Sequence, residues 1–243
     1  MAHLPQNIVI IFTTFVITGF VMLDSIAVSN DDHVTPMPPT STSVNRIDLI
    51  RPDAPELAAY GSFKIGVQTL ELIHTDQLDI VNAVQGEPIP TYDRPLTVEV
   101  WYPANLPVGE DTHGTYEVIT TDGTTVATLH GQAIRDVDPS MQDAPYPLVI
   151  ISHGYPGNRF LLGHLAENLA SKGYVVASID HTDSTYSDQA AFASTLLNRP
   201  LDQLFVLDEL ERLGQTTGTS FLAGLVDTNH TGIVGYSMGG YGV

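Results

Sequence analysis

The chain has 243 residues, of which 28 are acidic and 9 are basic, giving a formal net charge of −19. This charge excludes electrostatic binding to nucleic acid or to anionic membrane surfaces. There is no cysteine, so disulfide frameworks and thiolate chemistry are excluded as well. Lysine occurs only at Lys64 and Lys172, and this aspartate-rich composition predicts a protein that salt stabilises, because screening relieves self-repulsion.

The amino-terminal segment is predicted to direct export. Residues from Ile8 to Met22 are apolar but interrupted by threonine and glycine, as in the core of a signal peptide rather than a membrane span. Small residues at Ser25 and Ala27 permit cleavage after Ala27, so residues 1–27 are predicted to be a signal peptide and the mature protein periplasmic or extracellular. An uncleaved anchor that tethers the protein to a membrane is the alternative, because no Lys or Arg precedes Ile8. No stable membrane span is expected beyond this segment.

Residues 28–57 are rich in proline, serine and threonine without an apolar period, which predicts an extended tether. A folded domain is expected over residues 58–243. Its first part contains three segments that predict antiparallel strands at one edge of a sheet: 63–72, 79–84 and 96–101. Residues 108–145 form an acidic insertion rich in glycine and threonine. It is either a lid over the pocket or a surface loop, and composition does not separate the two.

The second half alternates between strand and helix signals. The predicted elements, in order, are a strand over 147–152, a helix over 160–170, a strand over 174–179, a helix opened by Pro200 that runs to Leu210, and a strand at 233–234. This order predicts a doubly wound, mostly parallel α/β sheet. Asp180 to Asp183 follow the second of these strands, at the edge where open sheets bind ligands. Two roles are open for them: substrate binding, or ordering of the following loop.

The last strand leads into Gly-Tyr-Ser-Met-Gly, the sequence form of a nucleophile elbow. The sharp turn lifts the hydroxyl of Ser237 out of the sheet for attack on a carbonyl carbon. Gly235 and Gly239 flank it because a Cβ atom at either position would collide with the neighbouring strand or helix. The backbone N–H of Met238 is then one donor of an oxyanion hole.

A second motif, His153-Gly154-Tyr155-Pro156-Gly157, follows the strand over 147–152. A strand followed by H-G-x-x-G is where enzymes of this kind place the second oxyanion donor, here the backbone N–H of Tyr155. Gly154 lets the loop turn that amide toward the substrate. His153 is either the catalytic base or a structural residue that holds the loop, and its position before the serine favours the structural role.

With these residues the chain resembles the α/β-hydrolases. More narrowly, it is similar to bacterial relatives of platelet-activating-factor acetylhydrolase, often grouped with predicted dienelactone hydrolases. That resemblance rests on Arg94 to Ala104, His153 to Gly157, Asp180 to Asp183 and the elbow around Ser237. Gly-Tyr-Ser-Met-Gly-Gly also resembles bacterial cutinases and polyester hydrolases, as does Tyr155 in the loop His153 to Gly157, which is called the oxyanion loop below. The resemblance implies an aspartate and a histidine beyond Val243, so the hydrolase sheet is expected to be incomplete after the elbow.

These features predict a serine carboxylic-ester hydrolase that acts through an acyl-enzyme on lipid or other short-acyl esters. Within enzymes, cutinase or polyesterase, thioesterase and peptidase activities remain open, because the triad does not choose the leaving group. A catalytically incomplete hydrolase fold, acting as a binding module, is the alternative from another class. The histidines show no metal-ligand spacing and no nucleotide-binding motif follows a strand, so no metal or cofactor is expected.

Overall fold

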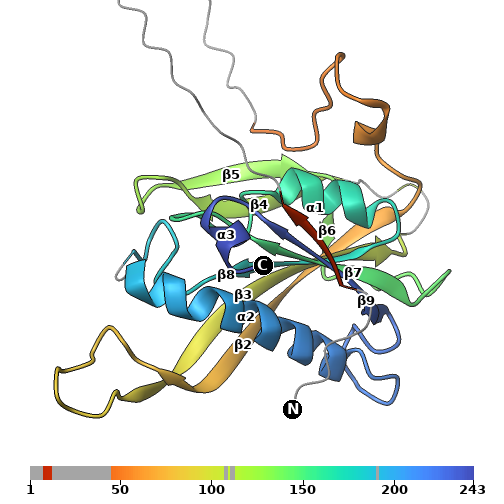
Figure 1. The fold of residues 1–243 in the computed structure, drawn as a ribbon. Helices are drawn as coiled ribbons and strands as arrows, with labels where there is room; N and C mark the ends of the chain where they lie inside the picture. Colours follow the sequence, from red (N-terminus) through yellow and green to blue (C-terminus); the bar gives the residue numbers. More distant parts are fainter. Residues whose placement is uncertain (1–7, 13–44, 107–108, 110–112, 190–191) are drawn as a thin grey trace, which may run out of the picture.

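The computed structural model describes residues 8–12, 45–106, 109, 113–189 and 192–243. They form a seven-stranded sheet in the order β1-β9-β7-β8-β3-β2-β6, with helices on both faces (Figure 1). The strands are β1 (Ile8–Phe12), β2 (Lys64–Leu78), β3 (Thr91–Ala104), β6 (Ile134–Arg135), β7 (Tyr146–Ser152), β8 (Val175–Asp180) and β9 (Val226–Gly235). Strands β1, β9, β7 and β8 are parallel, whereas β3 runs antiparallel to β8 and to β2. The predicted mostly parallel sheet of the α/β-hydrolase type is confirmed.

Alternate side chains of the central strands pack into two separate cores. In β7, Leu148 and Ile150 belong to the core under helix α2 (Phe192–Leu213), together with Val206 and Leu210 of that helix. Val149 and Ile151 of β7 belong to the core on the other face, under helix α1 (Gly163–Ala170). A strand buried on both faces is apolar at nearly every position, which is why the β7 segment reads as an unbroken apolar run.

Helix α2 begins earlier than the sequence predicts. Pro200 lies inside the helix rather than at its start, so the prediction that Pro200 opens it is wrong. The turns before the proline are held by one contact to another loop and one within the helix: Ser194 donates to Asp183, and Asn198 donates to Ser194 over 2.9 Å. These buried hydrogen bonds offset the backbone N–H that proline lacks.

The segment 79–84 is a loop between β2 and β3, so the strand predicted there is wrong. The Asp79 side chain accepts hydrogen bonds from the backbone and side-chain nitrogens of Asn82, which closes a local turn. Val81 and Val84 are exposed rather than packed. The antiparallel pairing of β2 with β3 agrees with the predicted arrangement.

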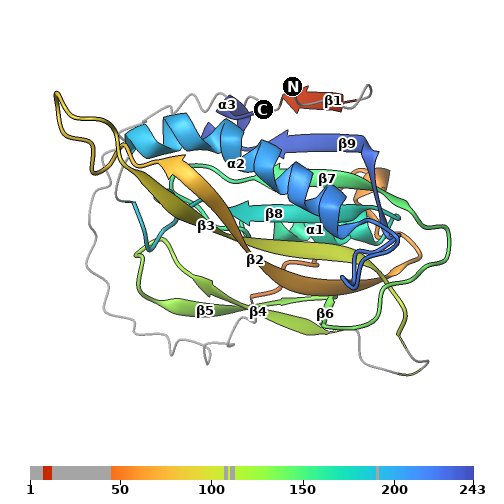
Figure 2. The ribbon, with the colours of Figure 1, turned by 90° about the horizontal axis from the view of Figure 1, so that it is seen from below.

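The insertion predicted over 108–145 contains a hairpin of β4 (Gly114–Ile119) and β5 (Val126–Gly131), and β6. The hairpin lies on the α1 side of the sheet, and Tyr116 is part of that core (Figure 2). The buried carboxylate of Glu167, in α1, accepts hydrogen bonds from the Tyr116 hydroxyl and from the backbone N–H groups of Gln132 and Ala133. This insertion is therefore a packed part of the domain over its described residues.

The amino-terminal residues contact the domain at two places. Strand β1 pairs in parallel with residues Thr231 to Gly235 of β9. Ile47 packs against the α1-side core, and a short 3-10 helix follows at Glu56–Ala58, so part of the segment predicted as a tether lies against the domain. The cleavage site predicted after Ala27 lies outside the described residues, as does most of the tether. Among the helices described, none combines the length and apolarity needed to cross a membrane.

Candidate active site

Ser237 occupies a strained turn between β9 and helix α3 (Met238–Tyr241). Its backbone has φ +53° and ψ −118°, a conformation that costs a residue with a side chain on the order of 1–3 kcal/mol. The serine is exposed, whereas Gly235 and Gly239 on either side of the turn are buried. A Cβ atom at Gly235 would lie 2.4 Å from the Gly240 nitrogen, and one at Gly239 would lie 2.0 Å from the Ser152 carbonyl oxygen. Only glycine fits at these two positions, as the elbow motif predicts.

The loop after β7 lies directly against this turn. The Tyr236 N–H donates to the Ser152 carbonyl over 3.0 Å. A Cβ atom added at Gly154 would lie 3.4 Å from the Ser237 Cβ atom and 3.1 Å from the Tyr236 ring. The structure therefore brings together two motifs that start 82 residues apart in the sequence, at His153 and Gly235, and a side chain at Gly154 would be in tight contact with the Tyr236 ring.

Within the described part of the chain, the two expected oxyanion donors find no acceptor for their N–H groups. Neither Tyr155 nor Met238 donates its backbone N–H to another atom of the described residues. The Ser237 carbonyl accepts from the Gly240 N–H over 2.9 Å. Because the carbonyl and N–H of a trans peptide point in opposite directions, the Met238 N–H points out of the amino-terminal end of α3.

His153 is enclosed beneath the loop, and both of its ring nitrogens are occupied. Nδ1 lies 2.6 Å from the Gly154 carbonyl oxygen, and Nε2 accepts the His181 backbone N–H over 3.3 Å. Burial lowers the pKa of His153 well below its usual value, and the neighbouring His181 and Arg199 lower it further. His153 is therefore neutral and holds the loop, and neither nitrogen remains for Ser237.

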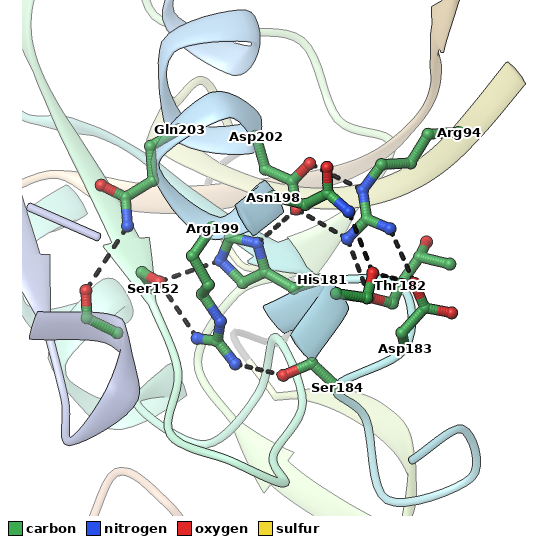
Figure 3. A network of polar contacts seen from close by, with 12 residues as sticks. Arg94, Ser152, His181, Thr182, Asp183, Ser184, Asn198, Arg199, Asp202 and Gln203 are labelled. Carbon is green, nitrogen blue, oxygen red and sulfur yellow. Dashed lines mark hydrogen bonds and ion pairs between the residues drawn. The ribbon is translucent and has the colours of Figure 1, made fainter. Parts of the chain in front are cut away.

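A buried chain of polar side chains lies behind the loop, and sequence reasoning missed it (Figure 3). Ser152 Oγ lies 2.9 Å from His181 Nε2, and His181 Nδ1 lies 2.8 Å from Asp202 Oδ2. These are the hydrogen bonds of a Ser-His-Asp triad, but Ser152, His181 and Asp202 have no exposed surface. No substrate carbonyl can reach Ser152, so this chain is structural.

The carboxylates after β8 are held by arginines. Arg94 pairs with Asp202 over 2.8 Å and with Asp183 over 3.0 Å, and it also donates to the Thr182 carbonyl. Asp180 pairs with Arg159. Of the two roles open for this segment, these contacts correspond to ordering of the loop. Although burial alone would raise the pKa of Asp202, hydrogen bonds from His181 and Arg94 lower it.

One sequence signal could have indicated the buried chain. Helix α2 carries Ser194, Asn198, Arg199 and Asp202 on the side that faces the sheet, where apolar residues are normal. Charged groups on the core-facing side of a helix must find partners, because an unpaired buried charge is costly. That pattern points to partners elsewhere in the sequence, although it does not say which.

The described residues place Ser237 and the two expected donor amides at one turn, but no hydrogen bond joins Ser237 to any of their histidines. The same residues contain no group of three or more His, Asp or Glu side chains placed to hold a metal ion. A cavity of about 740 Å³ lies elsewhere, between residues 47–60 and helix α1, and its lining includes neither Ser237 nor the oxyanion loop.

Comparison with known proteins agrees with the fold. A solved structure, a ferulic acid esterase from Streptomyces cinnamoneus, superimposes with a TM-score of 0.52 at 26% identity, covering 75% of this chain and 55% of that one. Bis(hydroxyethyl) terephthalate hydrolase from Streptomyces coelicolor is 31% identical over 134 residues, which are 55% of this chain and 39% of that protein. Cutinase est1 from Thermobifida alba is 32% identical over 97 residues, or 40% of this chain and 29% of that protein.

The chain thus spans less than half the length of these curated relatives. The profile of one family, described as PET hydrolase-like, matches residues 104–243. This match includes the oxyanion loop, the buried polar chain Ser152–His181–Asp202 and the elbow around Ser237. It agrees with the predicted hydrolase superfamily and with the resemblance to cutinases and polyester hydrolases, whereas the acetylhydrolase resemblance stays a prediction. The chain belongs to the PET hydrolase-like family of α/β-hydrolases.

Proposed function

We propose that this protein hydrolyses carboxylic esters through an acyl-enzyme formed on Ser237. The observation that carries the proposal is the strained, exposed Ser237 turn in contact with Gly154. Ser237 Oγ attacks the ester carbonyl carbon while a base takes the hydroxyl proton. The carbonyl oxygen becomes an oxyanion, which the N–H groups of Tyr155 and Met238 stabilise.

Collapse of this intermediate breaks the bond to the alcohol, which leaves with the proton that the base returns. Water, activated by the same base, then attacks the acyl group on Ser237 and releases the acid. The base and its acid partner are expected to be a histidine and an aspartate after Val243, as the resemblance implies. The same proposal includes export, which the interrupted apolar segment from Ile8 to Met22 supports.

Aromatic side chains of the elbow and of the loop beside it favour esters with a flat or bulky acyl group. The Tyr155 ring meets the Phe192 ring edge-on with centroids 5.0 Å apart, and Phe192 and Tyr236 are both about half exposed. Exposed aromatic rings beside a nucleophile offer apolar contact area to a substrate. The names of the relatives, which include a cutinase, a terephthalate ester hydrolase and a ferulic acid esterase, support this class over simple short-chain lipid esters.

The test uses the product of the complete gene with p-nitrophenyl butyrate and bis(hydroxyethyl) terephthalate. The unmodified protein should show a burst of p-nitrophenol and a butyryl adduct on the peptide that contains Ser237. Ser237→Ala should abolish both, whereas Ser152→Ala should still acquire the adduct at Ser237. Turnover retained in Ser237→Ala would refute the assignment. A folded protein without any adduct would instead favour a non-catalytic binding module.

A further inference from the structure

Arg199 is a fully buried residue of α2 that binds the oxyanion loop from behind (Figure 3). Its Nη1 donates to the His153 carbonyl and, over 3.3 Å, to Ser152 Oγ. Its Nη2 donates to the Gly154 carbonyl over 3.1 Å and to Ser184 Oγ. Two consecutive carbonyls of the loop therefore accept from a single guanidinium.

This arginine differs from the other buried arginine of the network, Arg94. Arg94 forms ion pairs with two aspartates, whereas in the part of the chain that the structure describes no carboxylate pairs with Arg199. Burial lowers the pKa of Arg199 to about 10, so the group stays charged at neutral pH. An unpaired buried charge is expensive, and the loop carbonyls and hydroxyls are the groups that compensate it.

The contact with Gly154 fixes the direction of the neighbouring amide. The Gly154 carbonyl accepts from Arg199 Nη2 and lies 2.6 Å from His153 Nδ1, so it points into the protein. The peptide between Gly154 and Tyr155 is trans, and in a trans peptide the N–H points opposite to the carbonyl. The Tyr155 N–H is therefore turned away from the buried guanidinium, toward the side on which Ser237 lies.

From this arrangement we infer that Arg199 is a positioning residue for the oxyanion hole: it holds the Gly154–Tyr155 peptide in the orientation that aims the Tyr155 N–H at the substrate oxygen. The inference rests on the proposed ester hydrolysis. Arg199 touches neither substrate nor Ser237, so it acts through the peptide plane alone.

Helix α2 also contacts the segment that carries the second expected donor, Met238. Gln203, one turn after Arg199, donates to the Gly239 carbonyl over 3.4 Å. Gly242, just after α3, lies so close that a Cβ atom there would be 2.6 Å from Gln203 Nε2 and 3.1 Å from the Arg199 Cβ atom. One face of α2 therefore holds both segments that carry the expected donors, which sets the spacing between the two N–H groups.

The test compares Arg199→Lys with Arg94→Lys in the product of the complete gene. Arg94 is a matched control, because it is equally buried in the same network but contacts no atom of the oxyanion loop. Removal of one oxyanion donor lowers kcat by about 10²–10³-fold. We expect Arg199→Lys to lower kcat about 10- to 100-fold with KM within about threefold, since a lysine can reach only one of the carbonyls.

The infrared stretching band of the acyl-enzyme carbonyl measures how strongly the N–H groups of the oxyanion hole hydrogen-bond to that carbonyl. This band should move to higher wavenumber in Arg199→Lys, because weaker hydrogen bonds polarise the acyl carbonyl less, and it should not move in Arg94→Lys. Equal losses of kcat in the two variants, with an unmoved band, would mean that Arg199 is merely structural and would overturn the inference. If Arg199→Lys does not fold, Ser184→Ala removes one anchor of the guanidinium, and its acyl-enzyme band should move in the same direction; an unmoved band there overturns the inference.

A second readout separates this inference from the proposed function. The ¹H–¹⁵N resonance of the Tyr155 amide should shift more in Arg199→Lys than in Arg94→Lys, whether or not the protein hydrolyses esters. An unmodified protein that forms no acyl adduct refutes the proposed function. A Tyr155 resonance that is the same in Arg199→Lys and the unmodified protein refutes the role of Arg199.

Discussion

The buried His181 makes the fold sensitive to mild acid. Its Nδ1 lies 2.8 Å from Asp202 and its Nε2 2.9 Å from Ser152, and the ring has no exposed surface. Desolvation lowers the pKa of His181 to about 4, although the hydrogen bond to Asp202 opposes this shift. His181 is consequently neutral in the folded protein at any pH above about 5.

The magnitude follows from linkage between protonation and folding. The unfolded chain binds a proton at His181 near pH 6.5 and the folded protein only near pH 4, so the stabilising contribution is complete above pH 6.5 and is lost as the pH falls. The separation of these pKa values corresponds to about 3 kcal/mol in full, and to about 2 kcal/mol between pH 7.5 and pH 5. His153, whose pKa is also lowered, acts in the same direction.

The assay is urea unfolding at pH 7.5 and pH 5, with His181→Gln as the comparison. The unmodified protein should lose about 2 kcal/mol or more of unfolding free energy over this interval. His181→Gln is less stable at pH 7.5 but has no imidazole to protonate, so its loss over the interval should be smaller by about 2 kcal/mol. Equal losses in both proteins, or an NMR titration of His181 centred near pH 6.5 in the folded state, would refute the reasoning.

Three further predictions concern the elbow, the hairpin and the surface. Gly239→Ala should reduce acylation of Ser237 at least about 100-fold, because its Cβ atom would collide with the Ser152 carbonyl; burst kinetics measure this, and a normal burst would contradict it. Glu167→Gln should lower the unfolding free energy by about 2–4 kcal/mol, since an amide cannot accept all the hydrogen bonds that bind the β4–β5 hairpin; an unchanged urea midpoint would count against that role. The melting temperature should rise as NaCl increases from low concentration, because salt screens the repulsion that comes with a net charge of −19. A melting temperature that does not change with NaCl would exclude charge repulsion as a major contribution to the stability.

The elements that could be predicted from the sequence are those with local causes. The apolar run before Ser152 predicted β7, because a buried parallel strand needs apolar side chains on both faces. Of β9 only residues 233–234 were predicted, since its first half carries polar side chains from Asp227 to Thr231. The turn at Ser237 was predictable because Gly-Tyr-Ser-Met-Gly is a known motif and the contact that requires Gly235 is with the neighbouring Gly240, although the contact that requires Gly239 is with the distant Ser152. The H-G-x-x-G motif gave the position of the loop, although not what holds it there.

The elements that were missed depend on contacts between distant segments. Pro200 is tolerated inside α2 because Ser194 and Asn198 anchor the preceding turn, and Asp183, which Ser194 reaches, lies in another loop. The buried polar chain joins residues from β7, the end of β8 and α2. Its members are separated by 29 and 21 residues in the sequence. Propensity and periodicity describe one element at a time, so they do not register a partner on another element.

Ser152 and Ser237 each have part of the surroundings that a catalytic serine needs, and they differ in their access to solvent. Ser152 has the histidine and aspartate contacts of a triad, but it has no exposed surface and its loop carbonyls point toward Arg199. Ser237 is exposed, and among the described residues the Tyr155 and Met238 N–H groups donate to no other atom and no histidine is hydrogen-bonded to the serine. A base raises the nucleophilicity of a hydroxyl only where a carbonyl carbon can approach it. The triad-like hydrogen bonds of Ser152 therefore mark a structural support, and in the proposed function the chemistry belongs to Ser237, beside the loop that this support holds.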